Sequence, residues 1–265
     1  MGAWEKVQKA RDKHRPLPLD FINAMIDGFM EFKGDRLFKE DGAVIGGVGF
    51  FMGTPVTVVA IQRGKTLEEN IMRNFGNPNP EGYRKALRLI RQAEKFRRPV
   101  IILIDTKGAG CAVEAEERGQ GEAIARCLFE TATVKTPIIS FITGEGGSGG
   151  ALALAVGDQV YMLENSIYSI LSPEGFSSIL YKDASKAKEA SEIMKITSDE
   201  LLKLRVIEGI VPEYGGIEKD FNLVVRDMSG IIRAFIDKAR SETDDALVEA
   251  RYNRFRSFGI GKWDA

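Results

Sequence analysis

The chain has 265 residues, of which 44% are hydrophobic and 28% are charged, and its formal net charge is −1. This length allows one larger domain or two small ones, and the near-neutral charge argues against binding to nucleic acids or membrane surfaces through bulk electrostatics. No apolar run approaches the ~20 residues that span a bilayer, and residues 1–18 lack the apolar core of a signal peptide, so we expect a soluble, cytoplasmic protein.

Cysteine and histidine are scarce, which limits the chemistry that side chains can supply. The sequence holds two cysteines, Cys111 and Cys127, and one histidine, His14, which lies in a charged run. This number of cysteines allows no disulfide framework and no four-cysteine zinc site, so we expect no metal site in this chain. We interpret His14 as a solvated residue at a helix end, which leaves no material for histidine-dependent triads.

The first 40 residues are predicted to form two helices. A charged helix runs from Trp4 to Arg15 and is ended by the prolines that follow. Asp20 is the expected cap of a second helix, which continues to Gly34 because apolar residues recur at helical spacing. These residues are Ile22, Met25, Ile26, Phe29 and Met30.

The periodicity then changes. Residues 43–51 and 55–61 are β-rich runs joined by a short turn, which predicts a β-hairpin. Residues 65–75 are expected to form a short helix or an ordered loop, and a longer helix is predicted over 83–96. A basic stripe on that helix is interpreted as a solvated face, with an electropositive rim for the phosphates of a large cofactor as the alternative. The stripe consists of Arg84, Arg88, Arg91 and Lys95.

Strands and helices alternate in the centre of the chain. Two similar units begin at Pro99 and Pro137, and each has an apolar strand, a glycine-bearing turn and a helix, the first of these helices over 114–131. Apolar strands that alternate with helices predict parallel strands buried on both faces. Further strands are expected near 159–163, 168–171 and 206–211, and further helices after 172–175 and over 186–194.

The C-terminal residues read as amphipathic helix. One face carries much apolar surface for a peripheral element, and we expect it to pack against a partner or a second copy of the chain. This face consists of Val224, Met228, Ile231, Ile232 and Phe235, and helical character continues over 245–255.

The densest motif is the sequence Gly-Glu-Gly-Gly-Ser-Gly-Gly at 144–150, which follows the second apolar strand as a glycine turn and precedes a helix of small residues. Glycine permits a positive φ and lets a ligand approach the backbone closely. The N–H groups at a helix start have no intrahelical partner, and the helix dipole favours negative charge there. The turn therefore suits an anion, or an oxygen that becomes one during a reaction.

Two well-known motifs also match these residues. The pattern G-x-G-x-x-G, with Glu164 about twenty residues later, is typical of dinucleotide sites, but it normally follows the first strand of its fold and here at least three strands precede it. The nucleophile elbow G-x-S-x-G would make Ser148 a nucleophile, yet no histidine follows it, and only a pairing with a lysine such as Lys182 remains formally possible. The P-loop pattern fails, because no Gly-Lys-Ser/Thr follows the glycines.

A backbone oxyanion hole without a nearby acid–base side chain remains. The turns at Gly108–Ala109 and Gly149–Gly150 follow neighbouring strands and could line one cavity. One preorganised donor can lower a barrier by ~3 kcal/mol when negative charge develops on a carbonyl oxygen. Formation of an enolate from a thioester, or release of a carboxylated urea, would fit this arrangement.

Several long motifs, in order over nearly the whole chain, resemble the carboxyltransferase α subunits of bacterial acetyl-CoA carboxylases. They occupy residues 2–4, 34–36, 73–76, 80–88, 115–126, 144–154 and 172–175. The resemblance implies an α/β fold of the crotonase-like (ClpP/crotonase) type, a spiral of ββα units with peripheral N- and C-terminal helices. Residues 1–265 would then form a single carboxyltransferase domain, with N-terminal helices in 1–40, the core in 41–215 and a C-terminal helical segment in 216–265.

The resemblance also implies an activity and its partners. Members transfer the carboxyl group of N1-carboxybiotin, carried on a biotin carrier protein, to acetyl-CoA, which gives malonyl-CoA for fatty acid synthesis. They work in an ATP-binding complex with biotin carboxylase, as an α2β2 heterotetramer whose β subunits hold the CoA ester and carry the only zinc. Gly149 and Gly150 match the family's oxyanion pair, which is expected to stabilise the biotin enolate as CO₂ leaves. The freed biotin then takes the methyl proton of acetyl-CoA.

Gly108, Ala109, Gly146 and Gly147 are the expected lining of the carboxybiotin pocket. One departure affects this pocket: family members read Asp-Thr-x-Gly-Ala-Tyr-Pro-Gly where this chain has residues 105–112 with Gly110, Cys111 and Ala112 in the last positions. We expect that loop to be less constrained. Two other functions remain open, a non-catalytic scaffold that binds CoA or a partner and a dinucleotide-dependent oxidoreductase.

Overall fold

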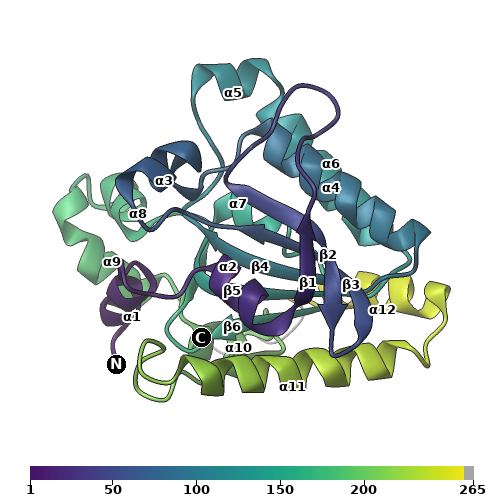
Figure 1. Ribbon diagram of the computed structural model, residues 1–265. Helices are drawn as coiled ribbons and strands as arrows, with labels where there is room; N and C mark the ends of the chain where they lie inside the picture. The colour runs from purple at the N-terminus through teal and green to yellow at the C-terminus, as the bar shows by residue number, and fades with distance from the viewer. Residues whose placement is uncertain (260–265) are drawn as a thin grey trace.

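The computed structural model describes residues 1–259, in which a single eight-stranded sheet is covered by helices on both faces (Figure 1). The strand order is β1-β2-β3-β4-β5-β6-β8, and β7 pairs with the end of β5. β1, β2 and β3 pair antiparallel, whereas all pairs from β3 onward are parallel. The strands are β1 (Asp27–Glu31), β2 (Val44–Phe51), β3 (Thr54–Ile61), β4 (Val100–Thr106), β5 (Ile138–Gly147), β6 (Gln159–Leu163), β7 (Ile167–Ser169) and β8 (Gly209–Val211).

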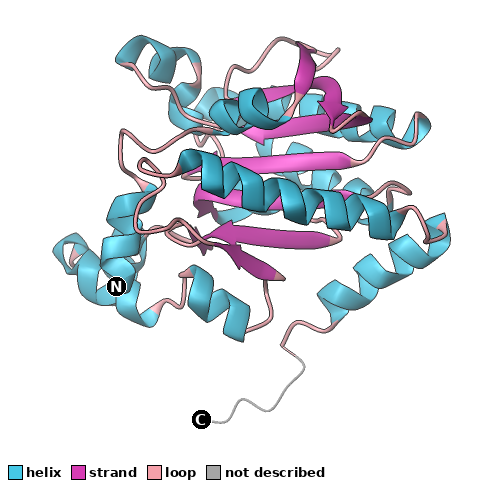
Figure 2. Cartoon of the chain, turned by 60° about the horizontal axis from the view of Figure 1, so that its bottom comes forward, coloured by secondary structure: helices cyan, strands magenta, loops and turns pink. Residues whose placement is uncertain are grey.

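The helices divide between the two faces of the sheet. α4 and α6 pack on one face, and α11 lies along the other, in front of the strands in Figure 2. The helices are α1 (Ala3–Ala10), α2 (Pro18–Met25), α3 (Leu67–Met72), α4 (Pro80–Lys95), α5 (Val113–Glu117), α6 (Gln120–Thr133), α7 (Ser148–Leu152), α8 (Pro173–Leu180), α9 (Ala187–Ile193), α10 (Ser198–Lys203), α11 (Phe221–Ala239) and α12 (Asp244–Arg256), with 3-10 turns η1 (Asn74–Gly76) and η2 (Ala184–Lys186).

β4 shows why both faces need a cover. All seven of its residues are buried, and successive side chains point to opposite faces. Ile101 and Leu103 join the apolar cluster on the α11 side, whereas Ile102 and Ile104 join the cluster on the α4 side. The prediction of parallel strands buried on both faces is confirmed, and so is the hairpin, which β2 and β3 form.

The second predicted helix is too long. α2 ends at Met25, and Ile26 already has an extended backbone with φ −116° and ψ 110°. The residues predicted to continue the helix instead form β1, which pairs with the outer edge of β2, so strand pairing overrides the helical spacing of Phe29 and Met30. Asp20 lies in the first turn rather than before it, and its carboxylate accepts a hydrogen bond from the N–H of Leu17 at 2.8 Å.

Two further boundaries differ from the prediction. The helix expected over 114–131 is two helices, α5 and α6, because Gly119 takes a left-handed conformation with φ +83° between them. The glycine turn is also shorter than expected, because β5 continues through Gly147 and α7 begins at the next residue.

The apolar face of the C-terminal helix is covered within the chain. Val224, Met228 and Ile232 of α11 are fully buried in the cluster that contains the inner side chains of β4 and β5. The prediction that this face packs against a partner or a second copy is therefore wrong. This face of α11 packs against the sheet of the same chain.

Candidate active site

The two predicted glycine turns lie against each other at the carboxyl ends of β4 and β5. These strands pair in parallel, and Thr106 is the register partner of Gly146. A Cβ atom on Gly150 would lie 2.5 Å from the backbone nitrogen of Ala109, and one on Gly147 would collide with the carbonyl oxygen of Lys107. Glycine is therefore required at 147 and 150 for the turns to approach this closely.

Ser148 makes the sharp change from strand to helix. Its φ is +54°, a left-handed value that costs a residue with a side chain about 1 kcal/mol or more. Gly149 and Gly150 are the next two residues and lie in the first turn of α7. The N–H groups of that turn have no acceptor within the helix, and Gly147, which precedes the helix, offers no side chain to satisfy them. Both N–H groups can therefore serve an oxygen from outside the helix.

Gly150 is held from the opposite side by α4. The buried hydroxyl of Tyr83 donates to the carbonyl oxygen of Gly150 at 3.2 Å, and the Cys127 thiol in turn donates to the carbonyl oxygen of Tyr83 at 3.2 Å. Burial raises the pKa of Tyr83 well above its usual value, so this hydroxyl keeps its proton. The predicted oxyanion pair is thus built into the interface between α4 and α7.

An apolar cavity of about 530 Å³ opens beside Gly149. Gly149 has room for a Cβ atom, because the nearest atom that it would meet is in the Ile124 side chain at 3.8 Å. Burial raises the pKa of Tyr168 to about 12, so this residue of the cavity wall is neutral. The cavity is lined by Ser148, Gly149, Leu152, Ala155, Val160, Tyr168, Ser169, Ile170, Leu201, Val206, Arg254, Phe255 and Phe258.

A second, charged hollow of about 360 Å³ lies beside Gly146 and Gly147. We refer to it as the polar hollow. Of the four residues expected to line the pocket, Gly146 and Gly147 line the polar hollow. Gly108 and Ala109 line neither cavity, because they pack against Gly150 of α7. The polar hollow is lined by Arg11, Lys107, Glu145, Gly146, Gly147, Ile167, Ser169, Ser172 and Glu174.

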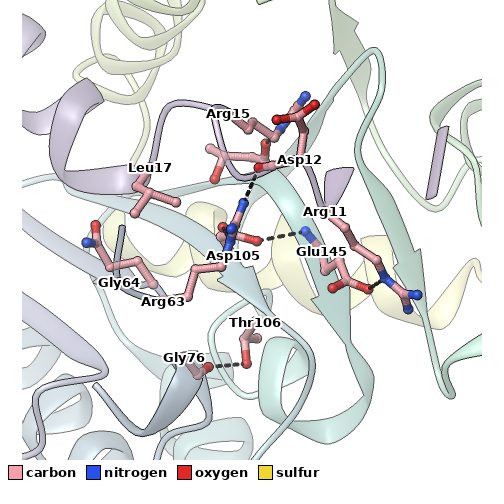
Figure 3. A network of polar contacts seen from close by, with 12 residues as sticks. Arg11, Asp12, Arg15, Leu17, Arg63, Gly64, Gly76, Asp105, Thr106 and Glu145 are labelled. Atoms are coloured by element: carbon pink, nitrogen blue, oxygen red, sulfur yellow. Dashed lines mark hydrogen bonds and ion pairs between the residues drawn. The ribbon is translucent and has the colours of Figure 1, made fainter. Parts of the chain in front are cut away.

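Arg11 joins three segments across the polar hollow. Its Nε donates to Glu145 at 2.8 Å, as Figure 3 shows, and its Nη1 donates to Glu174 at 2.6 Å. Burial alone would lower the pKa of Arg11, but the two carboxylates outweigh it and raise the pKa. Burial raises the pKa of Glu145 despite Arg11, whereas the bond from Arg11 lowers the pKa of the more exposed Glu174.

Asp105 fixes the backbone next to the polar hollow. Its Oδ1 accepts a hydrogen bond from the N–H of Glu145 at 2.9 Å, and its Oδ2 lies 3.5 Å from Nε of Arg63 (Figure 3). A side chain at Gly144 would collide with this carboxylate. The carboxyl end of β5 is therefore tied to β4 just before the oxyanion pair.

The nucleophile elbow has the backbone setting that it needs, because Ser148 makes a sharp strand-to-helix turn with a positive φ, but no histidine follows it in the chain. The dinucleotide motif lacks its setting. The glycines at 144–147 belong to β5, the fifth strand of the chain, rather than to a loop after the first. His14 is exposed, as predicted, and lies in the N-terminal segment, where its backbone N–H donates to Asp12. Glu164 accepts from the backbone N–H of Glu213 at 2.8 Å, so its carboxylate has a structural partner.

Two of the four cations in the basic stripe on α4 pair with carboxylates of the chain, and a third donates to a backbone carbonyl. Arg84 pairs with Asp35 at 3.1 Å, and Arg91 pairs with Glu130 of α6. Arg88 donates to the carbonyl oxygen of Gly34 at 2.9 Å. Because Arg84 and Arg88 are half-buried, the solvated-face interpretation is wrong for them, and these pairings leave the phosphate-rim alternative without support.

The altered loop after β4 is anchored at one point. The N–H of Gly110 donates to the carbonyl oxygen of Pro78 at 2.8 Å, while Cys111 and Ala112 are exposed.

Within residues 1–259, no group of three or more His, Cys, Asp or Glu side chains could hold a metal ion. No helix in that range is long and apolar enough to cross a membrane.

Comparisons with known proteins give a consistent result. Residues 1–259 match a family model described as acetyl co-enzyme A carboxylase carboxyltransferase-like. An acetyl-coenzyme A carboxylase carboxyl transferase subunit alpha from Clostridium acetobutylicum is 53% identical over 97% of this chain and 94% of its own length. A protein from Natranaerobius thermophilus named as the beta/alpha subunits is 54% identical over 97% of this chain, which spans 42% of that protein.

The fold also resembles solved structures. A transcarboxylase 12S structure with hydrolysed methylmalonyl-coenzyme A bound has a TM-score of 0.70 at 16% identity, over 91% of this chain and 45% of that one. The beta subunit of a geranyl-CoA carboxylase from P. aeruginosa has a TM-score of 0.66, also at 16% identity, over 93% of this chain and 46% of that one. The chain spans less than half of each. The predicted crotonase-like α/β fold is confirmed.

Proposed function

Since the chain belongs to the acetyl-CoA carboxylase carboxyltransferase family, we propose that it is the α subunit of this enzyme. In this role it transfers the carboxyl group of N1-carboxybiotin, presented by a biotin carrier protein, to acetyl-CoA and gives malonyl-CoA. The family match over residues 1–259 supports the assignment, and the geometry at one turn supports the chemistry.

That geometry is the position of Gly149 and Gly150 in the first turn of α7. Their N–H groups are preorganised, because Tyr83 and the turn after β4 hold the helix start in place. When CO₂ leaves carboxybiotin, negative charge collects on the ureido oxygen, and donors fixed in advance stabilise that charge without reorganising. Each donor can lower the activation barrier by ~3 kcal/mol.

The chain's own residues fit a biotin ring better than a phosphate. The cavity beside Gly149 is largely apolar, and its one arginine, Arg254, is already paired with Glu208 at 2.6 Å. A ring system that carries a single polar carbonyl suits such a cavity, which is lined by Gly149, the residue directly before Gly150 in the chain. Gly146 and Gly147 border the site on its polar side, and Gly108 and Ala109 support it from behind.

The second half of the site would come from a β subunit. The relative from Natranaerobius thermophilus joins beta and alpha subunits in one chain, which supports a β partner for this chain. In this proposal the β subunit holds acetyl-CoA and the zinc ion, two α and two β chains assemble, and biotin carboxylase recharges biotin at the expense of ATP. The released biotin takes the methyl proton of acetyl-CoA, which agrees with a cavity beside Gly149 that offers no carboxylate.

Reconstitution tests the proposal. The purified chain is mixed with a β subunit, and carboxyl transfer from malonyl-CoA to biocytin is followed. We expect turnover that requires both subunits. A well-folded complex without turnover would leave the chain as a scaffold that binds CoA or a partner.

A further inference from the structure

The polar hollow holds two cations beside the glycine strand end. Arg11 reaches it from the end of α1, and Lys107 reaches it from the turn after β4. The hollow measures about 360 Å³, and Gly146 and Gly147 form part of its wall. It therefore lies next to the turn that carries the proposed oxyanion pair, and Ser169 lines both this hollow and the apolar cavity.

Arg11 is shared between two carboxylates that differ in exposure. The side chain of Glu145 is 10% exposed, and its backbone N–H is held by Asp105. The side chain of Glu174 is 41% exposed and stands at the start of α8, with Arg11 as its ion-pair partner in this site. Glu145 is thus the fixed partner of Arg11, and Glu174 is the partner that solvent can replace.

Lys107 has no carboxylate partner of its own in this site. The ion pairs here join Arg11 to Glu145 and Glu174, and Arg63 to Asp105. Lys107 is exposed on the wall of the hollow, close enough for its charge to act on Glu145. A small anion that entered the hollow would find this ammonium group unpaired and the Arg11 guanidinium within reach.

We propose that the polar hollow binds a carboxylate group through Lys107 and Arg11, and that Glu174 occupies the place of this carboxylate on Arg11 when the hollow is empty. A guanidinium forms two parallel hydrogen bonds to a carboxylate, and such charge-assisted bonds are about twice as strong as neutral ones. The inference deepens the proposed function and rests on it, because the carboxylate is then the group that is transferred between biotin and the CoA ester.

Malonate is a suitable probe, and its binding to the full-length chain can be measured by isothermal titration calorimetry at low ionic strength. We expect saturable binding to one site. Lys107→Met should weaken it about tenfold, because one charge-assisted contact is lost. Glu174→Gln should tighten it several-fold, because the variant removes the competing carboxylate. Lys188→Met, which changes an exposed lysine on α9, is the matched control and should bind like the wild type.

The opposite signs of the two effects make the test decisive. A Glu174 that only holds α8 in place would make Glu174→Gln bind malonate no better than the wild type, and that result overturns the proposal. Absence of saturable binding, or equal affinity in Lys107→Met, overturns it too. Carboxyl transfer by a reconstituted complex whose chain does not bind malonate would refute this site and leave the proposed function standing. Malonate binding with the expected shifts in a complex that transfers nothing would support the carboxylate site and refute the proposed function.

Discussion

The hydroxyl of Tyr83 donates a hydrogen bond to the carbonyl oxygen of Gly150 at 3.2 Å, across 67 positions of the chain. Both residues are buried, so neither group has water as an alternative partner. Because Gly150 contributes one of the two proposed oxyanion donors, this bond links the packing of α4 to the geometry of the reaction site. Stability and activity should therefore respond together when it is removed.

Tyr83→Phe tests this link. The variant leaves the carbonyl oxygen of Gly150 buried without its partner, which should lower the free energy of unfolding by about 1 to 3 kcal/mol. The rate of carboxyl transfer should fall, with a larger change in kcat than in KM. The displaced N–H donors stabilise charge that develops only in the transition state. Chemical denaturation and steady-state kinetics measure the two effects. Tyr252→Phe, at an exposed tyrosine, is the control, and an equal response of both variants would argue against the link.

The two glycines of the oxyanion pair should tolerate substitution differently. A Cβ on Gly150 would lie 2.5 Å from the nitrogen of Ala109, whereas one on Gly149 would meet its nearest neighbour at 3.8 Å. Gly150→Ala should therefore lower the free energy of unfolding by about 1 to 3 kcal/mol through overpacking, and Gly149→Ala should change it little. Urea denaturation of both variants provides the comparison. Equal stabilities would contradict the close approach of the two turns.

The pair of Arg15 and Glu213 should make stability depend on pH. Burial opposes the charge of Glu213, but Arg15 at 2.5 Å and the amide of Asn165 outweigh it and lower the pKa of Glu213 below its usual 4.5. The stabilisation is then present above that usual value and is lost as the pH falls through the lowered folded value.

Glu213→Gln should accordingly cost about 3 kcal/mol or more at neutral pH, because Arg15 is left buried without a counter-charge. The difference from the wild type should shrink in acid, as the pH falls from the usual pKa of 4.5 through the lowered pKa of the folded state and the wild-type carboxyl also becomes protonated. Denaturation curves at several pH values measure it, with exposed Glu189→Gln as the control. A difference that does not change with pH would rule out an ionised Glu213.

Arg251 should be irreplaceable by lysine. Its buried guanidinium binds Asp158 at 2.8 Å and donates to the carbonyl oxygens of Thr131, Val134 and Thr136. Lysine has the charge but not the planar set of donors, so Arg251→Lys should lose about 3 kcal/mol or more of stability. Exposed Arg256→Lys is the control, and thermal unfolding of the two variants measures the effect. Similar melting temperatures would show that charge alone holds α12.

Local patterns were enough to predict the parallel strands and the two glycine turns that follow neighbouring strands. β4 and β5 are short apolar runs between turn residues. The glycines at the end of β5 and the start of α7 indicate a place where another backbone segment comes close. The helix predicted through Met30 failed because the pairing of β1 with β2 is a tertiary effect that helical spacing does not report. The partner proposed for α11 failed for a similar reason, since an amphipathic face does not specify which surface covers it.

The polar hollow could not be predicted from sequence patterns. Arg11 lies 134 positions from Glu145 and 163 positions from Glu174, so no motif spacing connects them. Glu145 belongs to the glycine motif, and the expectation that no acid–base side chain lies near the glycine turn is wrong for this residue, which lines the polar hollow. The lone hint was that a charged residue interrupts a glycine run at a strand end, where burial raises its pKa.

Gly149 and Gly150 are proposed to act on the transferred group, and a substitution at Gly149 tests this role. The chain and its Gly149→Val variant are each reconstituted with a β subunit, and carboxyl transfer from malonyl-CoA to biocytin is compared after circular dichroism shows that both are folded. We predict transfer by the wild type and a loss of about 100-fold or more in the variant, because a valine side chain next to the N–H donors would hinder the approach of the carboxybiotin carbonyl, whereas a Cβ atom at this position meets no atom closer than 3.8 Å. A folded variant as active as the wild type would contradict it.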